Sequence, residues 1–372
     1  MSFFDENIGR IILDGWEKNR TLDDAVAMLS NYLKVNKIEK KDARDIVKRF
    51  DKILNLWEGD IKEKHIKTST QRENEDMDKL SKFAVKKKQK EREHNFVHDK
   101  NRTDFQRDRD RILWSHSFRR LSNKTQLFPT GSDEQLRRRL THSIEVMQLA
   151  LTIANSFGLN ADLTAAGALA HDIGHAPFGH AGELAIDNTL KQISISLGGF
   201  NHYEHGVDVV RYLDDMYLSS GIGPNPGLNL TMETMECIFK HTFFRTREDV
   251  PEGVQEKSQE ELSDITKHDF LRDNTSCHLE GQAVRIADKI SYLVSDIEDG
   301  IRIGVIKLGD LLECKFFERS PLDIVPRSGE SLFERIISQR RAVINILITD
   351  LLNVTDGNLS EMNDLKDIRN KK

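Results

Sequence analysis

Apolar residues recur at spacings of three and four along most of this chain, and this pattern is typical of amphipathic helices. Alternating β-branched residues, the usual signal of a strand, are rare, and there are only seven prolines. We therefore predict an all-α fold. The clearest predicted helices in its central and C-terminal parts cover approximately residues 134–157, 160–171, 231–242, 281–301 and 332–352.

The N-terminal part is predicted to be a separate small module. Residues 1–66 contain two helical patterns, over about 22–33 and 40–56, and no residues that suggest chemistry. We interpret this stretch as a helical packing or adaptor module, with binding of a partner protein or DNA as the alternative. Residues 67–78 are polar throughout and are predicted to be a linker to a main domain over 79–372.

Composition excludes some classes of protein. A net charge of −6, with 31% charged and 38% apolar residues, does not describe a nucleic-acid-binding polycation. No apolar run approaches the roughly 20 residues that span a bilayer, and no secretory signal is recognisable at the N-terminus. The three cysteines are widely spaced, which predicts reduced thiols in a cytoplasmic protein. None forms a Cys-x-x-Cys pair, which argues against a thiolate zinc site.

Histidines and carboxylates gather in one segment, residues 139–183. One histidine in a core is usually a hydrogen-bonded structural residue, but a dense group beside glycines favours a metal or proton-transfer site. Neutral imidazole and carboxylate together are ligands for divalent cations such as Zn, Fe, Mn or Mg. The group consists of His142, His171, Asp172, His175, His180 and Glu183.

The helix predicted over 285–296 adds a second polar set. Its apolar residues share one face, while Asp288, Tyr292 and Asp296 share another with Arg285 and Lys289. A solvated helix face would give the same pattern. The functional alternative is that Asp288 completes the metal site.

Two histidines and two carboxylates would leave coordination positions open, as in a catalytic metal site that admits water and a phosphate oxygen. Phosphate oxygens also need cationic partners, for which Arg139, Lys240 and Lys289 are candidates. The Walker phosphate loop, the Gly-x-Ser-x-Gly elbow and the His-Glu-x-x-His protease motif are all absent from the sequence.

The order His142, His171-Asp172, Asp288 matches the H…HD…D pattern of HD-domain metal-dependent phosphohydrolases. The surrounding motifs resemble more specifically the deoxyguanosinetriphosphate triphosphohydrolase (dNTPase) family, from about residue 80 to 304. The motifs that carry this resemblance are residues 107–112, 118–126, 139–146, 171–183, 227–231 and 285–292.

This resemblance implies a helical HD fold that hydrolyses a dNTP, with dGTP a favoured candidate, at the α-phosphate to deoxynucleoside and tripolyphosphate. It implies a divalent cation (Mg, Mn or Fe) on His142, His171, Asp172 and Asp288. It implies proton transfer by His180 and Glu183, with His175 near the phosphates. The residues that it implies for substrate binding are Gln126, Arg139, His202, Lys240, Lys289, Tyr292 and Asp296. His205 and Gly206 depart from the commoner Gln-Ser of the family.

Family resemblance also implies a homo-oligomer, with nucleotide or single-stranded DNA as a possible effector. Two alternatives stay open: an HD phosphohydrolase that acts on another nucleotide or on nucleic-acid ends, and a nucleotide-binding sensor without turnover. Retention of the proton-transfer pair argues against the sensor, because a pure binding protein has no use for it.

Overall fold

The computed structural model describes residues 67–88, 92–94, 101–128, 134–193, 199–214, 227–241 and 275–370 of the chain. These residues are mostly helical, and they contain no strand beyond an isolated bridge between Thr125 and Arg138. The predicted all-α fold is confirmed. Within these ranges, no helix is long and apolar enough to cross a membrane.

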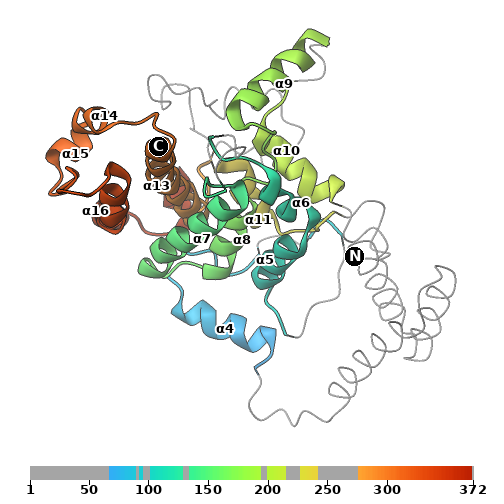
Figure 1. Cartoon of the computed structure of the whole chain (residues 1–372). Coiled ribbons are helices and arrows are strands. Elements are labelled where there is room, and N and C mark those ends of the chain that lie inside the picture. The colour runs from blue at the N-terminus through green and yellow to red at the C-terminus, as the bar shows by residue number, and fades with distance from the viewer. Residues whose placement is uncertain are drawn as a thin grey trace, which may run out of the picture.

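Helix α8 (Ala161–Ala170) lies at the centre of the fold (Figure 1). Asn160 caps its first turn by accepting from the amide of Leu163, and every residue from 163 to 170 is buried. A helix that is apolar on all sides must be covered on all sides. Ala166, Leu169 and Ala170 pack into one apolar cluster, whereas Ala168 faces another.

Helices α7 (Arg139–Ser156) and α13 (Leu279–Arg302) pack against each other and against α8. On α7 the buried apolar side chains recur at helical spacing, and together with those of α13 and α16 (Leu332–Ser360) they form the second cluster. Because α7, α8 and α13 meet, polar residues on their facing sides come together at the end of α8.

The other side of α8 is covered by α11 (Met232–Lys240), which Thr231 caps, and by α5 (Asp104–Trp114). α10 (His202–Asp208) packs against α11 and continues into a π-helical turn, η3 (Val209–Leu213). α9 (Gly179–Ile193) extends outward beside α10 (Figure 1).

The remaining elements are short. Near α5 are α6 (His116–Arg120) and the 3-10 turn η1 (Leu121–Asn123). After α13 the chain forms α14 (Leu308–Leu312) and α15 (Lys315–Arg319), which lie away from α9 (Figure 1), and it ends in α17 (Leu365–Asn370).

Three predicted elements differ from the structure. The polar stretch 67–78 is helix α4 (Ser69–Lys79), stabilised by a capping box between Thr68 and Gln71 rather than by apolar burial. The helix predicted from 134 begins at Arg139, because Arg138 forms the bridge with Thr125. The helix predicted to end at 352 continues to Ser360. The two helices predicted within residues 1–66, and the module itself, lie outside the described residues, so the domain division stays a prediction.

Candidate functional site

Three side chains from different elements converge at the C-terminal end of α8. His142 comes from α7, His171 follows the last residue of α8, and Asp288 comes from α13. His142 Nε2 lies 2.8 Å from Asp288 Oδ1, and His171 Nε2 lies 3.6 Å from the same oxygen. One ligand atom of each residue lies within 4.8 Å of the others, so these three can share one metal ion.

Asp172 lies beside this group and is held by a cation. Its Oδ1 is 3.5 Å from His171 Nε2, and its Oδ2 accepts a 2.7 Å hydrogen bond from Arg139 Nη1. Burial acts to raise the pKa of Asp172, but Arg139 and the neighbouring histidines outweigh it and hold that pKa well below its usual range. The carboxylate is therefore ionised and available to a metal.

His171 provides the local test of whether a metal fits. Its Nδ1 lies 2.7 Å from the carbonyl oxygen of Ala168, so Nδ1 carries the hydrogen and donates it. In the neutral ring Nε2 then holds a lone pair, and this fully buried atom has no hydrogen-bond partner. In metal-binding histidines, the ring nitrogen that does not bind the metal usually donates to a carbonyl or carboxylate in this way, which fixes the tautomer. The residues present therefore fit a divalent cation.

The electrostatics of His171 agree with that fit. Burial acts to lower the pKa of His171, but the carboxylates of Asp172 and Asp288 outweigh it and raise the pKa to about 9. The same field that strengthens proton binding attracts a cation. The four metal ligands inferred from the sequence therefore lie together in the fold.

A second group adjoins the first. Glu183 on α9 accepts hydrogen bonds from His202 Nδ1, at 2.9 Å, and from the His202 amide, at 3.0 Å. The ring of His175 stacks on that of His202 with centroids 3.8 Å apart, and its Nε2 lies 3.2 Å from Asp172 Oδ1. His175 thus connects the two groups.

His180 lies at the outer end of this second group. Its side chain is 78% exposed, and its Nδ1 lies 3.6 Å from Glu183 Oε2. Glu183 raises the pKa of His180. Burial acts to raise the pKa of Glu183, but His180 and His202 outweigh it and lower that pKa. By contrast, burial first and His202 next lower the pKa of His175 well below its usual value, so its ring is neutral.

The residues predicted to contact the nucleoside lie on the same side of α13 as Asp288. Tyr292 and Asp296 follow it at intervals of four residues and, like Lys289, are partly buried. Asp296 Oδ1 and Gln126 Oε1 are buried atoms without a hydrogen-bond partner, which leaves them available to a ligand. Burial raises the pKa of Asp296 to about 6.

Lys240 has protein partners. Its Nζ donates to Glu236 at 2.8 Å and to the carbonyl oxygen of Thr275 at 3.1 Å, and the side chain is buried at the end of α11. Glu236 also accepts from Arg369. The predicted role of Lys240 in phosphate binding therefore requires that this ion-pair network rearrange, and it stays a prediction.

Two further residues join the site that the sequence analysis did not assign to it. His241 is fully buried with its ring edge-on to that of His171, 5.3 Å between centroids. Lys124 Nζ donates to the carbonyl oxygen of His175 at 2.6 Å, and burial together with Arg139 lowers the Lys124 pKa to about 8. Lys124 lies in the 118–126 motif, which was a usable signal. His241 directly follows the end of α11, and nothing local distinguishes it.

Comparison with known proteins defines the class. The HD domain family model matches residues 139–293, the stretch that contains all four metal-ligand candidates. Relatives cover more of the chain. A deoxyguanosinetriphosphate triphosphohydrolase-like protein of Bordetella pertussis is 38% identical over 277 residues, 74% of this chain and 67% of the relative. One from Thiobacillus denitrificans is 39% identical over 272 residues, 72% of this chain and 66% of the relative.

The family-model match identifies the chain as an HD-domain protein. The chain belongs to the deoxyguanosinetriphosphate triphosphohydrolase-like family, as its motifs predicted. It covers about two thirds of the length of these relatives.

Proposed function

We propose that this protein is a metal-dependent dNTP triphosphohydrolase that releases deoxynucleoside and tripolyphosphate, with dGTP the favoured substrate. The observation that carries the proposal is the junction of the two groups. A buried set of metal ligands lies directly beside a histidine–glutamate set, and Asp172 Oδ1 is 3.2 Å from His175 Nε2. Metal-assisted hydrolysis of a phosphoester needs both parts within reach of one phosphorus atom.

His142, His171, Asp172 and Asp288 would hold the cation. When bound, a divalent cation supplies positive charge to a phosphoryl oxygen and lowers the pKa of water. Arg139 keeps Asp172 ionised through its 2.7 Å hydrogen bond, and its Nε atom has no protein partner. That Nε–H can donate to a phosphate oxygen while Nη1 remains on Asp172.

His180 and Glu183 would move the proton. Glu183 remains a carboxylate, because His180 and His202 lower its pKa. It therefore favours the protonated form of His180, which faces solvent and can reach a substrate oxygen. A protonated His180 would donate to the leaving oxygen, and a neutral one would accept from the attacking water.

The nucleoside would lie along α13. Tyr292 under the sugar would leave little room for a 2′-hydroxyl group, which would favour deoxyribonucleotides. Asp296 and Gln126 each present a buried oxygen without a partner, and a hydroxyl or amino group of the substrate would satisfy it. Lys289 and, after rearrangement, Lys240 would neutralise phosphate charge. We also propose that the protein forms a homo-oligomer that is regulated by nucleotide or single-stranded DNA.

The test is product analysis. The protein is incubated with each of the four dNTPs in Mn²⁺ or Mg²⁺, alone and with a second nucleotide as effector, and products are separated by ion-exchange chromatography. We expect intact tripolyphosphate and deoxynucleoside, and loss of both in His171→Ala. His116→Ala, which removes a partly exposed histidine at the start of α6, is the matched control and should retain activity.

Other products would contradict the proposal in defined ways. Orthophosphate or pyrophosphate would indicate a different HD phosphohydrolase reaction. Absence of turnover with metal bound and effector present would indicate a nucleotide-binding protein without catalysis.

A further inference from the structure

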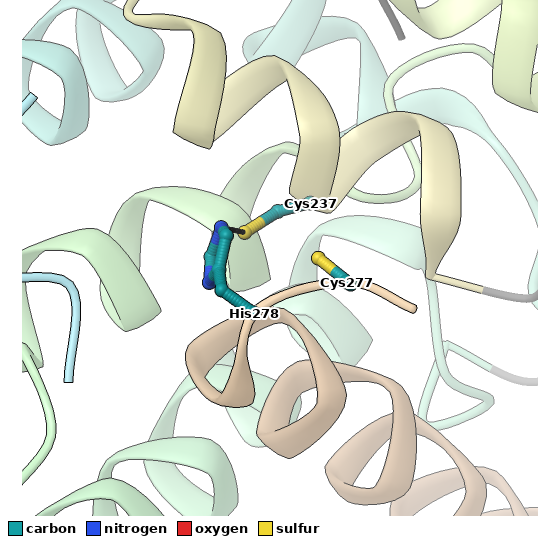
Figure 2. Close-up of side chains that lie close together, drawn as sticks. All are labelled: Cys237, Cys277 and His278. Atoms are coloured by element: carbon teal, nitrogen blue, oxygen red, sulfur yellow. Dashed lines mark hydrogen bonds between the residues drawn. The ribbon is translucent and has the colours of Figure 1, made fainter. Parts of the chain in front are cut away.

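A second set of metal-type donors lies about one helical turn along α8 from the substrate site, the group around His142, His171, Asp172 and Asp288: Gly167, which faces Cys237, is four residues before His171. Cys237 on α11, Cys277 in the segment before α13, and His278 at the N-cap of α13 point toward one another (Figure 2). They are 0%, 5% and 0% exposed. The lack of a Cys-x-x-Cys pair argued against such a site, but the packing of α11 against α13 brings together residues that are 40 positions apart.

The spacing of the three donors suits one small ion. One ligand atom of each residue lies within 4.8 Å of the others, and Cys237 Sγ is 3.7 Å from His278 Nε2. Zinc bonds of about 2.3 Å to sulfur and about 2.0 Å to nitrogen at a tetrahedral angle place those two atoms about 3.5 Å apart. The observed separation therefore needs little adjustment.

Glu280 fixes the orientation of His278. Its Oε2 lies 3.2 Å from His278 Nδ1, while its Oε1 accepts from the amides of Val85 and Asn160. The amide of Gly281 also lies 3.3 Å from Nδ1, but an ionised carboxylate at 3.2 Å would repel a lone pair there. With a metal ion bound, Nδ1 would carry the hydrogen and donate it to Glu280, and Nε2 would offer its lone pair to the ion between the sulfurs. This carboxylate–histidine arrangement is the one that supports zinc-bound histidines.

We propose that Cys237, Cys277 and His278 bind a structural zinc ion that is distinct from the cation of the substrate site. Soft thiolate donors select zinc, whereas the imidazole–carboxylate set beside α7 also suits Mn or Mg. The carbonyl oxygen of Glu233, 3.2 Å from His278 Nε2, or a water would occupy the fourth position. Binding releases the thiol protons to solvent.

Close packing explains why the sulfurs converge. A Cβ atom at Gly167 would lie 2.8 Å from Cys237 Sγ, and one at Gly281 would lie 2.1 Å from Cys277 Sγ. Both positions are glycine, so α8 and α13 approach the sulfur atoms directly. The ion would thus tie α11 and α13 together against α8.

Such a tie would affect the substrate site indirectly. The amide of His171 donates its helical hydrogen bond to the carbonyl oxygen of Gly167, Asp288 lies on α13, and His241 directly follows α11. All three depend on how α8, α11 and α13 pack. Loss of the ion should therefore lower the melting temperature and loosen the site without removing any of its ligands.

Cobalt substitution tests the proposal on the full-length protein. Tetrahedral thiolate-bound Co²⁺ gives sulfur-to-cobalt charge-transfer absorption, which a site of nitrogen and oxygen ligands does not. We expect this absorption in the wild type, zinc in the protein as purified, and retention of both in His171→Ala. Cys277→Ser should lose the absorption, whereas Cys314→Ser, which alters the exposed cysteine, should keep it.

Three results would overturn the proposal: no charge-transfer absorption in the wild type, unchanged absorption in Cys277→Ser, or a disulfide between Cys237 and Cys277 detected by thiol titration of the denatured, unreduced protein. If Cys277→Ser does not fold, the wild-type and Cys314→Ser spectra and the thiol titration still decide the question.

Discussion

Gly174→Ala should disturb the fold and the substrate site together. Gly174 lies in the turn after α8, where an added Cβ would be 2.1 Å from the carbonyl oxygen of His202 and 2.3 Å from the amide nitrogen of Gly206. Both atoms belong to the backbone of α10, so no side-chain rotation can relieve the contact. Ordinary contact begins at 3.4 Å, and α10 must therefore move by 3.4 − 2.1, or about 1.3 Å.

The size of the effect follows from this displacement. Overpacking of this kind costs about 1–3 kcal/mol of unfolding free energy. In a domain of 150–250 residues, each kcal/mol lowers the melting temperature by about 2–4 °C. α10 also carries His202, which contacts Glu183 at 2.9 Å and stacks on His175. A misplacement of about 1 Å costs on the order of 100-fold in rate.

Circular dichroism during heating measures the first effect, and dNTP hydrolysis measures the second. Gly357→Ala is the matched control, because a Cβ at this position of α16 has no atom within 4 Å. In a helix interior this change should stabilise the protein by up to about 1 kcal/mol. A Gly174→Ala protein that melts like the wild type would refute the packing argument. Reduced stability with unchanged turnover would refute the link to His202.

Three other substitutions test individual groups. Glu183→Gln removes the carboxylate that raises the pKa of His180. The inflection of the pH–rate profile that reports His180 should therefore move to lower pH, and the rate should fall by about 10²–10⁴-fold. An inflection at the wild-type pH would contradict the pairing of Glu183 with His180. Tyr292→Ala should reduce discrimination between dGTP and GTP, and undiminished rejection of GTP would remove Tyr292 as the cause. Asp296 has a folded pKa of about 6, raised by burial, so ionising it costs stability as pH rises from about 4 through 6. Asp296→Asn should abolish this decline in unfolding free energy, which is on the order of 2 kcal/mol at most between pH 4 and pH 6. Denaturant unfolding at these two pH values measures the difference.

Most of the helical framework could be predicted from the sequence. The cap at Asn160, the apolar run that follows it and the cap at Thr231 are local signals, and the structure forms α8 and α11 where those signals predict them. Helix α4 was missed because it has no apolar face, and its capping box alone did not distinguish a helix from a polar linker.

The metal-ligand residues could also be recognised from the sequence, because they form a motif. Their residue types and order form a motif, and His171-Asp172 are adjacent in the chain, so the set was visible before the fold was known. The partners of that set were less visible. Glu183 was paired with His180, three residues away, but in the structure its close hydrogen bonds come from His202.

The sequence by itself determined the helical class, the positions of the central helices and the chemical types of the metal-binding set, because periodicity, caps and motifs depend on neighbours along the chain. Only the tertiary structure placed His241 against His171, engaged Glu236 with Arg369 and gathered Cys237 with Cys277 and His278. These contacts join residues on separate helices or fix the rotamer of a buried side chain. They are decided by how α8, α11 and α13 pack, and a one-dimensional pattern does not contain that packing.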